Sequence, residues 1–319
     1  MQILYDIAGR LDLGAVAEPP RRLTGGFTHR MYSLTTVRGR FAVKLLNPHI
    51  MARPDAMDNF RRAESLEALL EKTAVPILPA LRFGGEKMQA LGGQYFYIYD
   101  WFDGRALSGS EILPSHCSII GAGLAQIHRI DRREEPCAPE PIGFDWDFLT
   151  GRLLDAQPEL GALVKGRRDM LHECQRRANE AFGRLPAVTA ICHSDMDSKN
   201  VLWRGDECRI IDLECLGRSN PHLELYETAL YWSGIEECSI DPQRFEAFIR
   251  SYAEAGGELP PDWAAVHDAN AGRLGWLEYN IRRALGMDCA EDEIAIGISE
   301  TKKTLAQLEC YMRIREKLV

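Results

Sequence analysis

The sequence lacks any cysteine arrangement that would define a metal site or a disulfide framework. Its nine cysteines are odd in number, are scattered from Cys117 to Cys310, and include no C-x-x-C pair. Neither a zinc ribbon nor a disulfide-stapled scaffold is therefore indicated. Unpaired cysteines of this kind are typical of a reducing compartment, so we expect a cytoplasmic protein.

Long apolar runs and an excess of positive charge are also missing. No stretch is apolar over the roughly 20 residues that a membrane helix needs, and Asp6 and Asp12 stand where a signal peptide would be basic and then apolar. The formal net charge is -9, whereas proteins that bind nucleic acids generally present a basic face. We expect neither a membrane nor a nucleic acid as partner, and the sequence leaves the oligomeric state open.

The first third of the chain has the alternating pattern of paired strands. Apolar residues alternate within residues 23–46 on both sides of a turn at 37–39, and a second strand pair is expected at 79–83 and 94–100. Between the two pairs, residues 55–72 carry apolar residues at helical spacing.

The remainder of the chain is mostly helical in pattern. Helices are expected at 115–129, 147–183, 222–234, 242–256, 262–286 and 291–317. One short hairpin, 201–203 with 209–213, interrupts them. The chain is therefore a β-rich first third followed by a helical remainder, with a hinge near residues 100–104.

Two features of the first third point to phosphate binding. Gly25 and Gly26 lie between two expected strands; glycines there let backbone N–H groups approach a phosphate, although a tight hairpin would also explain them. Lys44 is the one charge inside an apolar strand, so it must reach water or an anionic partner. Glu64 on the next helix is the candidate partner, Glu67 is its rival, and a solvated helix face is the alternative.

A polar loop with the pattern H-x-D-x-x-x-x-N leads directly into a strand. Asp195 could orient a hydroxyl nucleophile and accept its proton late in the reaction, and Asn200 could bind a metal through its amide oxygen. Asp212 would lie beside Asn200 across the hairpin, and an Asp next to an Asn suits Mg²⁺. His193, by itself, is more typical of a packed structural residue.

Together these motifs resemble the aminoglycoside phosphotransferase/choline kinase group, the small-molecule branch of the protein-kinase-like fold. The resemblance covers most of the chain, in the order LTGGFTHRMYSL, FAVKLL, RRAESLEALL, YIYDWFDG, LAQIHRI, HSDMDSKNVLW and IIDLE. It implies a bilobal α+β fold with a small β-rich nucleotide-binding lobe, 1–102, and a larger helical lobe, 103–319, that holds the catalytic loop and substrate pocket. It also implies ATP and Mg²⁺ as cofactors and a small-molecule alcohol as acceptor.

The resemblance further assigns roles to single residues. Asp195 becomes the catalytic base, Asn200 and Asp212 hold Mg²⁺, and Lys44 contacts the α- and β-phosphates with Glu64 behind it.

At the hinge, the resemblance implies that the backbone of Asp100, Trp101 and Phe102 binds adenine, with Tyr99 lining the back of the pocket.

Several positions depart from the commonest family pattern or stay open. Ser194 stands where Gly is usual, and His29 where many relatives carry Asn. Lys199 could reach the γ-phosphate or be an ordinary surface lysine. Glu214 could support the metal site or cap the strand end, and Asp197 has no necessary role beyond shaping the turn or facing solvent.

The substrate is expected to be a small alcohol and not a protein. The triplet after the hairpin is Asp212-Leu213-Glu214 in place of D-F-G, and helical periodicity resumes by about His222, which leaves no room for an activation segment. A cationic acceptor is slightly favoured over a neutral sugar, although exposed helix faces and core packing would explain the same residues. The residues concerned are the acids Glu224, Glu227, Glu236, Glu237 and Glu278 and the aromatics Trp232, Trp276 and Tyr279.

We therefore expect an ATP-dependent small-molecule kinase, with two alternatives. A nucleotide-binding module without transfer activity would be expected to have lost a catalytic position, and none is lost. A metal-dependent hydrolase built on His193, Asp195 and Asp197 would need further ligands, but the histidines are dispersed, with no H-x-H or H-E-x-x-H.

Overall fold

The computed structural model describes residues 1–23, 29–135, 139–287, 289 and 291–318. Contacts between residues divide the chain into two compact units. Unit 1 comprises Met1–Glu111 and His193–Gly217, and unit 2 comprises Ile112–Cys192 and Arg218–Val319.

Unit 1 is built on a five-stranded antiparallel sheet with the order β1-β2-β3-β5-β4. The strands are β1 (Arg21–Arg22), β2 (Arg30–Thr36), β3 (Gly39–Leu45), β4 (Gln89–Leu91) and β5 (Gln94–Asp100). The helices of this unit are α1 (Gln2–Arg10), α2 (Pro48–Met51), α3 (Ala56–Leu70) and the 3₁₀ turn η1 (Gly109–Glu111).

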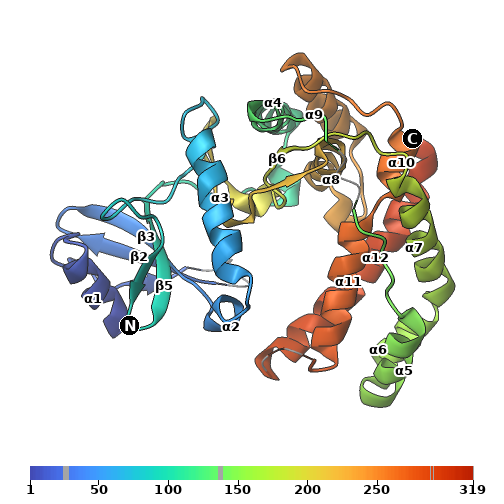
Figure 1. Ribbon diagram of the computed structural model, residues 1–319, viewed down its shortest axis with the longest axis horizontal. Coiled ribbons are helices and arrows are strands. Elements are labelled where there is room, and N and C mark those ends of the chain that lie inside the picture. The colour runs from blue at the N-terminus through green and yellow to red at the C-terminus, as the bar shows by residue number, and fades with distance from the viewer. Residues whose placement is uncertain (24–28, 136–138, 288, 290, 319) are drawn as a thin grey trace. The chain divides into compact units, whose positions relative to one another are not determined.

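The two faces of the sheet pack against different helices (Figure 1). Leu34, Val43 and Ile98 are fully buried on one face, in a cluster with Leu4 and Ile7 of α1. Because side chains alternate along a strand, Lys44 is directed to the opposite face, where Phe60 of α3 packs with Tyr97. This face carries the candidate active site.

Most elements of the first third agree with the sequence pattern, and one expected strand is wrong. The β2–β3 hairpin and the helix within 55–72 are confirmed. Residues 79–83 form no strand beyond an isolated bridge from Phe83 to Glu86; β4 (Gln89–Leu91) pairs with β5 instead. The positive φ angles of Gly92 and Gly93 explain this pairing, because they close a tight turn that sets Leu91 opposite Gln94. Helix α1 was not expected.

The catalytic-loop region is part of unit 1 by its contacts. It contains η2 (Ser198–Asn200), the hairpin of β7 (Val201–Arg204) and β8 (Glu207–Ile210), and η3 (Leu213–Cys215). The backbone of Ile210 bonds to both Pro76 and Leu78, at 2.8 Å each, and Trp203 exchanges two backbone bonds with Arg105. These bonds group the hairpin with the sheet. The family resemblance, by contrast, implies that the hairpin belongs to the lobe that begins after residue 102.

The described residues of unit 2 form helices and two short strands, β6 (Ala190–Cys192) and β9 (Gly217–Ser219), which pair. Its α-helices are α4 (Pro114–Ile130), α5 (Trp146–Ala156), α6 (Pro158–Lys165), α7 (Arg168–Phe182), α8 (Pro221–Ser233), α9 (Pro242–Glu254), α10 (Trp263–Asp268), α11 (Ala271–Ala284) and α12 (Ile294–Leu318). The 3₁₀ turns are η4 (Ile235–Glu237) and η5 (Glu291–Glu293).

The helical segments of unit 2 agree with the expected ones, except that two are subdivided. The run 147–183 is three helices. The first break falls at Pro158, which starts α6 and has no N–H to continue the preceding helix, and the second falls between Lys165 and Arg168. The run 262–286 is divided at Ala269 and Asn270 into α10 and α11. Within the described ranges, no helix combines the length and the apolar character needed to span a membrane.

Candidate active site

Lys44 lies in a cluster of carboxylates. Its ammonium forms ion pairs with Asp212 and Glu214, and only 9% of its side chain is exposed. Asp212 follows β8 in a left-handed conformation, with φ 67. Burial by itself raises the pKa of Asp212, but the charge and the hydrogen bond of Lys44, with smaller contributions from two histidines, together outweigh burial, and the net pKa is lowered. The carboxylate is therefore ionised at neutral pH.

Glu214 has one carboxylate oxygen with a charged partner and one without a partner. Oε1 pairs with Lys44, while Oε2 is buried and has no hydrogen-bond partner among the described residues. His29 Nε2 lies 3.8 Å from Oε1, and its Nδ1 accepts a bond from the Asn47 backbone at 3.0 Å. Burial, assisted by Lys44, lowers the pKa of His29 to about 4. At neutral pH, therefore, His29 adds no positive charge to the cluster.

The catalytic loop is held by a buried histidine. The His193 side chain has no exposed surface, its Nδ1 accepts from the backbone N–H of Asp195 at 3.3 Å, and its Nε2 lies 2.9 Å from the carbonyl oxygen of Ile211. Because Nδ1 is an acceptor here, Nε2 carries the proton and donates to that carbonyl. His193 thus connects the start of the loop to the end of β8. Ser194, with φ 68, explains why glycine is usual at this position.

Asn200 positions Asp195 and lies next to Asp212. Its side-chain nitrogen donates to both the backbone carbonyl and Oδ2 of Asp195, each at 2.8 Å. Its backbone carbonyl accepts from the backbone N–H of Ile211 at 2.9 Å, which pairs Asn200 with the residue directly before Asp212, where the hairpin strands end. The structure therefore brings together the three residues that the loop motif singled out.

Asp197 and Lys199 form a second ionic group on the loop. Asp197 Oδ1 caps η2 by accepting from the Lys199 backbone at 2.9 Å. The Lys199 ammonium lies 2.5 Å from Asp197 Oδ2 and 3.1 Å from Asp195 Oδ1. Burial opposes the charge on Lys199, but the two carboxylates outweigh burial and raise its pKa. Asp197 therefore shapes the turn and also holds Lys199 beside Asp195.

Glu64 lies in the site without pairing with Lys44. Its Oε1 accepts from the Tyr97 hydroxyl at 2.9 Å and from the Met88 backbone at 3.1 Å. Tyr97 is the cross-strand neighbour of Lys44, so its hydroxyl reaches Glu64 from the same face of the sheet. A cavity of about 10 Å³ is lined by both Glu64 and Glu214. The structure thus pairs Lys44 with Asp212 and Glu214, a correction to the expected Lys44–Glu64 pair.

Glu67, the rival partner, is engaged elsewhere. Its Oε1 lies 2.8 Å from the ammonium of Lys87, which has no exposed surface, and accepts from the Ala80 backbone at 2.9 Å. Burial raises the pKa of Glu67, and Lys87 works against that shift. Sequence reasoning missed Lys87. It also left the role of Glu214 open, although the I-D-x-E spacing was a signal for it.

The expected adenine-binding segment follows directly after the sheet. Asp100 is the last residue of β5 and pairs with Phe41. The Trp101 backbone donates to the Arg40 carbonyl at 3.2 Å, and the Arg40 guanidinium lies 3.6 Å from the Trp101 ring centre. Phe102 follows them in the chain. Adenine binding by this segment remains a prediction.

Two predicted residues, Gly25 and Gly26, lie outside the described residues. The donor set of the described ones fits a divalent cation. Asp212 and Glu214 both pair with Lys44, so their carboxylates lie close together, and the buried Oε2 of Glu214 has no partner in the described part of the chain. Hard cations such as Mg²⁺ prefer carboxylate and amide oxygens.

Comparisons with known proteins point to one family. Residues 20–268 match the family model described as Phosphotransferase enzyme family. Homoserine kinase of Methylobacillus flagellatus is 22% identical over 249 residues, which cover 78% of this chain and 72% of the relative. Stress response kinase A of Salmonella typhi is 23% identical over 294 residues, covering 89% and 82%.

Solved structures show the same fold. A spectinomycin phosphotransferase in complex with ADP and spectinomycin superposes with a TM-score of 0.76 at 13% identity, covering 99% of this chain and 98% of the other. A Plasmodium vivax ethanolamine kinase gives a TM-score of 0.57 at 16% identity, covering 90% and 81%. The expected α+β, bilobal protein-kinase-like fold is confirmed.

Proposed function

Because this chain belongs to the phosphotransferase enzyme family and is a small-molecule kinase, we propose that it transfers the γ-phosphate of Mg²⁺-bound ATP to a hydroxyl of a small molecule. The observation that carries this proposal is the arrangement of the catalytic loop in unit 1. Asn200 holds Asp195 at 2.8 Å, and Lys44 forms ion pairs with Asp212 and Glu214.

Asp195 is the proposed catalytic base. One of its oxygens accepts from Asn200 and the other faces Lys199, so the carboxylate is fixed in orientation. Its side chain is still 37% exposed, which leaves room for a hydroxyl to approach. A carboxylate so placed orients the hydroxyl and accepts its proton late in phosphoryl transfer.

Asn200 and Asp212 are the proposed metal-binding residues, with Glu214 beside them. Mg²⁺ held by these residues would supply positive charge to offset the negative charge that develops on the transferred phosphoryl group. In the structure Lys44 neutralises Asp212 and Glu214, and we propose that it turns to the α- and β-phosphate oxygens when nucleotide binds. Glu64 would then support this face through Tyr97, and Lys199 would contact the γ-phosphate. Gly25, Gly26 and the segment 100–102 complete the proposed nucleotide site.

An exposed aromatic pair supports a cationic acceptor. Trp276 and Tyr279 of α11 are 45% and 39% exposed, and their ring centres lie 5.7 Å apart. Exposed aromatic faces bind cations with about 0.5–2 kcal/mol; the Arg283 guanidinium already lies 5.3 Å from the Tyr279 ring centre, which leaves Trp276 as the main candidate for an ammonium group. Trp232, by contrast, is fully buried and belongs to the core. Homoserine and ethanolamine, the substrates named for two similar proteins, each join an amine to a hydroxyl.

Several acids of unit 2 already have cationic partners and give weaker support. Glu227 pairs with Arg273 at 2.9 Å, and Glu236 pairs with Lys303 at 2.7 Å. The cationic preference therefore rests mainly on the aromatic pair.

The test measures ADP release with Mg²⁺ and ATP across a panel of aminoglycosides, homoserine, choline-like amino alcohols, thioribose and hexosamines. Asp195→Asn should lower kcat by about 10²–10⁴-fold with an accepted substrate, while the melting-temperature shift caused by Mg·ATP is kept. Asp212→Asn, which tolerates the left-handed backbone, should lose the Mg²⁺-dependent part of that shift. Asp206→Asn, at the exposed turn of the same hairpin, is the matched control.

Equal turnover in Asp195→Asn would remove the base assignment. A nucleotide-induced shift without ADP release from any alcohol would favour a nucleotide-binding module. Release of phosphate from substrates without ATP would favour a hydrolase.

A further inference from the structure

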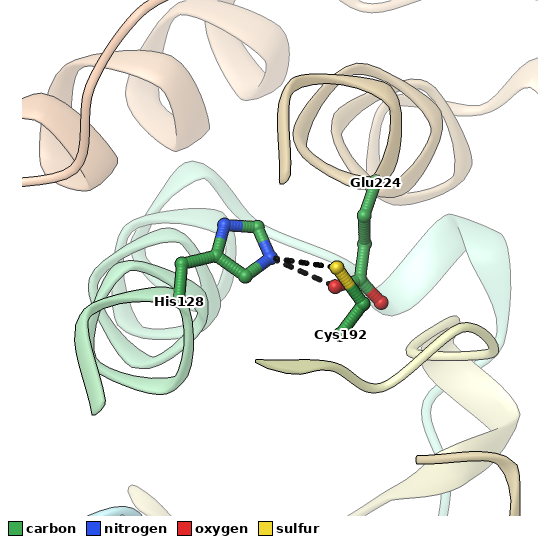
Figure 2. A group of neighbouring side chains, drawn as sticks. All are labelled: His128, Cys192 and Glu224. Atoms are coloured by element: carbon green, nitrogen blue, oxygen red, sulfur yellow. Dashed lines mark hydrogen bonds and ion pairs between the residues drawn. The ribbon is translucent and has the colours of Figure 1, made fainter. Parts of the chain in front are cut away.

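Unit 2 contains a second cluster of side chains with metal-binding atoms. His128 on α4, Cys192 at the end of β6 and Glu224 on α8 point toward one another (Figure 2). His128 Nε2 lies 2.8 Å from Glu224 Oε2 and 3.9 Å from Cys192 Sγ. The three donor atoms all lie within 4.8 Å of one another.

We propose that His128, Cys192 and Glu224 bind a divalent transition-metal ion of the Zn²⁺ class. Bonds of about 2.0–2.1 Å to nitrogen or oxygen and 2.3 Å to sulfur place tetrahedral ligand atoms about 3.3 Å (N to O) and 3.6 Å (N to S) apart. The observed separations are 2.8 and 3.9 Å, and the third pair lies within 4.8 Å, so movements of about 1 Å or less convert the cluster into three ligands of one ion.

The charges of the cluster match such an ion. His128 and Cys192 are 2% and 1% exposed, and the Glu224 side chain is 8% exposed. A thiolate and a carboxylate together neutralise a dication, which removes the cost of burying a net charge. The Cys192 thiol gives up its proton to solvent, and the imidazole stays neutral with its proton on Nδ1. Binding thus releases one proton for each ion.

A partner for the second imidazole nitrogen is already in place. His128 Nδ1 lies 2.8 Å from the hydroxyl of Tyr252. A phenol can donate to Nδ1 when Nε2 carries the proton, and can accept from Nδ1–H when Nε2 binds a metal. Metal-binding histidines nearly always have such a partner for the other nitrogen.

One residue of the cluster, His128, lines a cavity. This cavity of about 230 Å³ is lined by seven residues, among them His128, Tyr252, Pro221 and Glu258. It is large enough for several waters, so a hydrated ion can reach the imidazole.

This site is chemically distinct from the proposed nucleotide site. Mg²⁺ takes oxygen ligands, whereas a histidine–cysteine–carboxylate set favours Zn²⁺ and similar ions. In the chain, Cys192 directly precedes His193 of the catalytic loop, so a bound ion would anchor the strand from which that loop starts.

The experiment titrates Co²⁺, a spectroscopic substitute for Zn²⁺, into the reduced and chelator-treated full chain. One equivalent should give the near-ultraviolet charge-transfer band of a thiolate–cobalt bond. Stoichiometric Zn²⁺ should remove the band, and a large excess of Mg²⁺ should leave it. Cys192→Ser should abolish it. Cys117→Ser is the matched control, because Cys117 is also buried in unit 2 with its thiol directed at a backbone carbonyl.

A second variant covers the case in which Cys192→Ser fails to fold. His128→Gln keeps an amide donor for Glu224 and should weaken Co²⁺ binding by at least about tenfold. Absence of the band in the unmodified chain, an undiminished band in folded Cys192→Ser, or unchanged affinity in folded His128→Gln would each overturn the proposal. None of these readouts depends on kinase activity.

Discussion

Replacing Lys44 by methionine tests whether this lysine neutralises the acids of the active site. Methionine keeps most of the length and the unbranched apolar stem of the side chain, and it removes the ammonium with its charge and its hydrogen-bond donors. Asp212 and Glu214 would then face each other without a counter-charge, and the Glu214 side chain is only 10% exposed. We expect a chain that folds with clearly reduced stability, in addition to loss of activity.

The size of the loss follows from the contacts. A unit ion pair about 3 Å apart gains about 5 kcal/mol at an effective dielectric near 20, and Lys44 makes two such pairs. Burial of the ammonium cancels much of this gain, and breaking a buried pair typically costs 3–5 kcal/mol. Because the Asp212 side chain is 29% exposed, we expect the low end, about 3 kcal/mol, or a melting temperature lower by about 4–5 °C for a chain of this length.

A double-mutant cycle with Glu214→Gln isolates the charge effect. Chemical denaturation without nucleotide gives the free energy of unfolding of the parent, of Lys44→Met, of Glu214→Gln and of the double variant. Glu214→Gln should recover about 2 kcal/mol of the loss caused by Lys44→Met, because it removes one of the two unpaired carboxylates. If Lys44→Met is within 0.5 kcal/mol of the parent, or if the two changes are additive, the reasoning is wrong.

Two further predictions concern unit 2. Gly121→Ala should lower the free energy of unfolding by about 1–3 kcal/mol, because the added Cβ would lie 2.4 Å from the carbonyl oxygen of Phe248. Gly123→Ala, whose added Cβ would have nothing within 4 Å, should raise the free energy of unfolding by up to about 1 kcal/mol. Equal effects of the two variants in chemical denaturation would contradict the packing argument. Burial lowers the pKa of His267 to about 4, so the folded state resists a proton that the unfolded chain accepts below about pH 6.5. Above pH 6.5 the histidine is neutral in both states and does not lower the free energy of unfolding; between pH 6.5 and 4 it lowers that free energy by about 1.4 kcal/mol per pH unit. Urea unfolding at several pH values should show a shallower loss in His267→Gln, and an identical loss would refute the assignment.

The sequence by itself determined the elements that depend on local pattern. The β2–β3 hairpin, the amphipathic helix α3 and the helices of unit 2 follow from periodicities of two and 3.6 residues. The catalytic loop could also be predicted from sequence, because Asp195, Asn200 and Asp212 lie within 18 residues that form one hairpin and its flanks. The family followed from the ordered set of such motifs.

Only the tertiary structure decided which acid pairs with Lys44. Glu64, Glu67 and Glu214 carry the same charge, and no local pattern ranks them. In the structure Glu64 accepts a hydrogen bond from Tyr97, and Glu67 pairs with the buried Lys87. The fold brings Glu214 to Lys44 across a separation of 170 residues.

The proximity of His128, Cys192 and Glu224 could also be recognised only in the tertiary structure. Each residue has an ordinary place in its own helix or strand, and they meet because α4, β6 and α8 pack together. Local periodicity specifies which face of an element is buried, whereas long-range packing specifies what each buried polar group will touch.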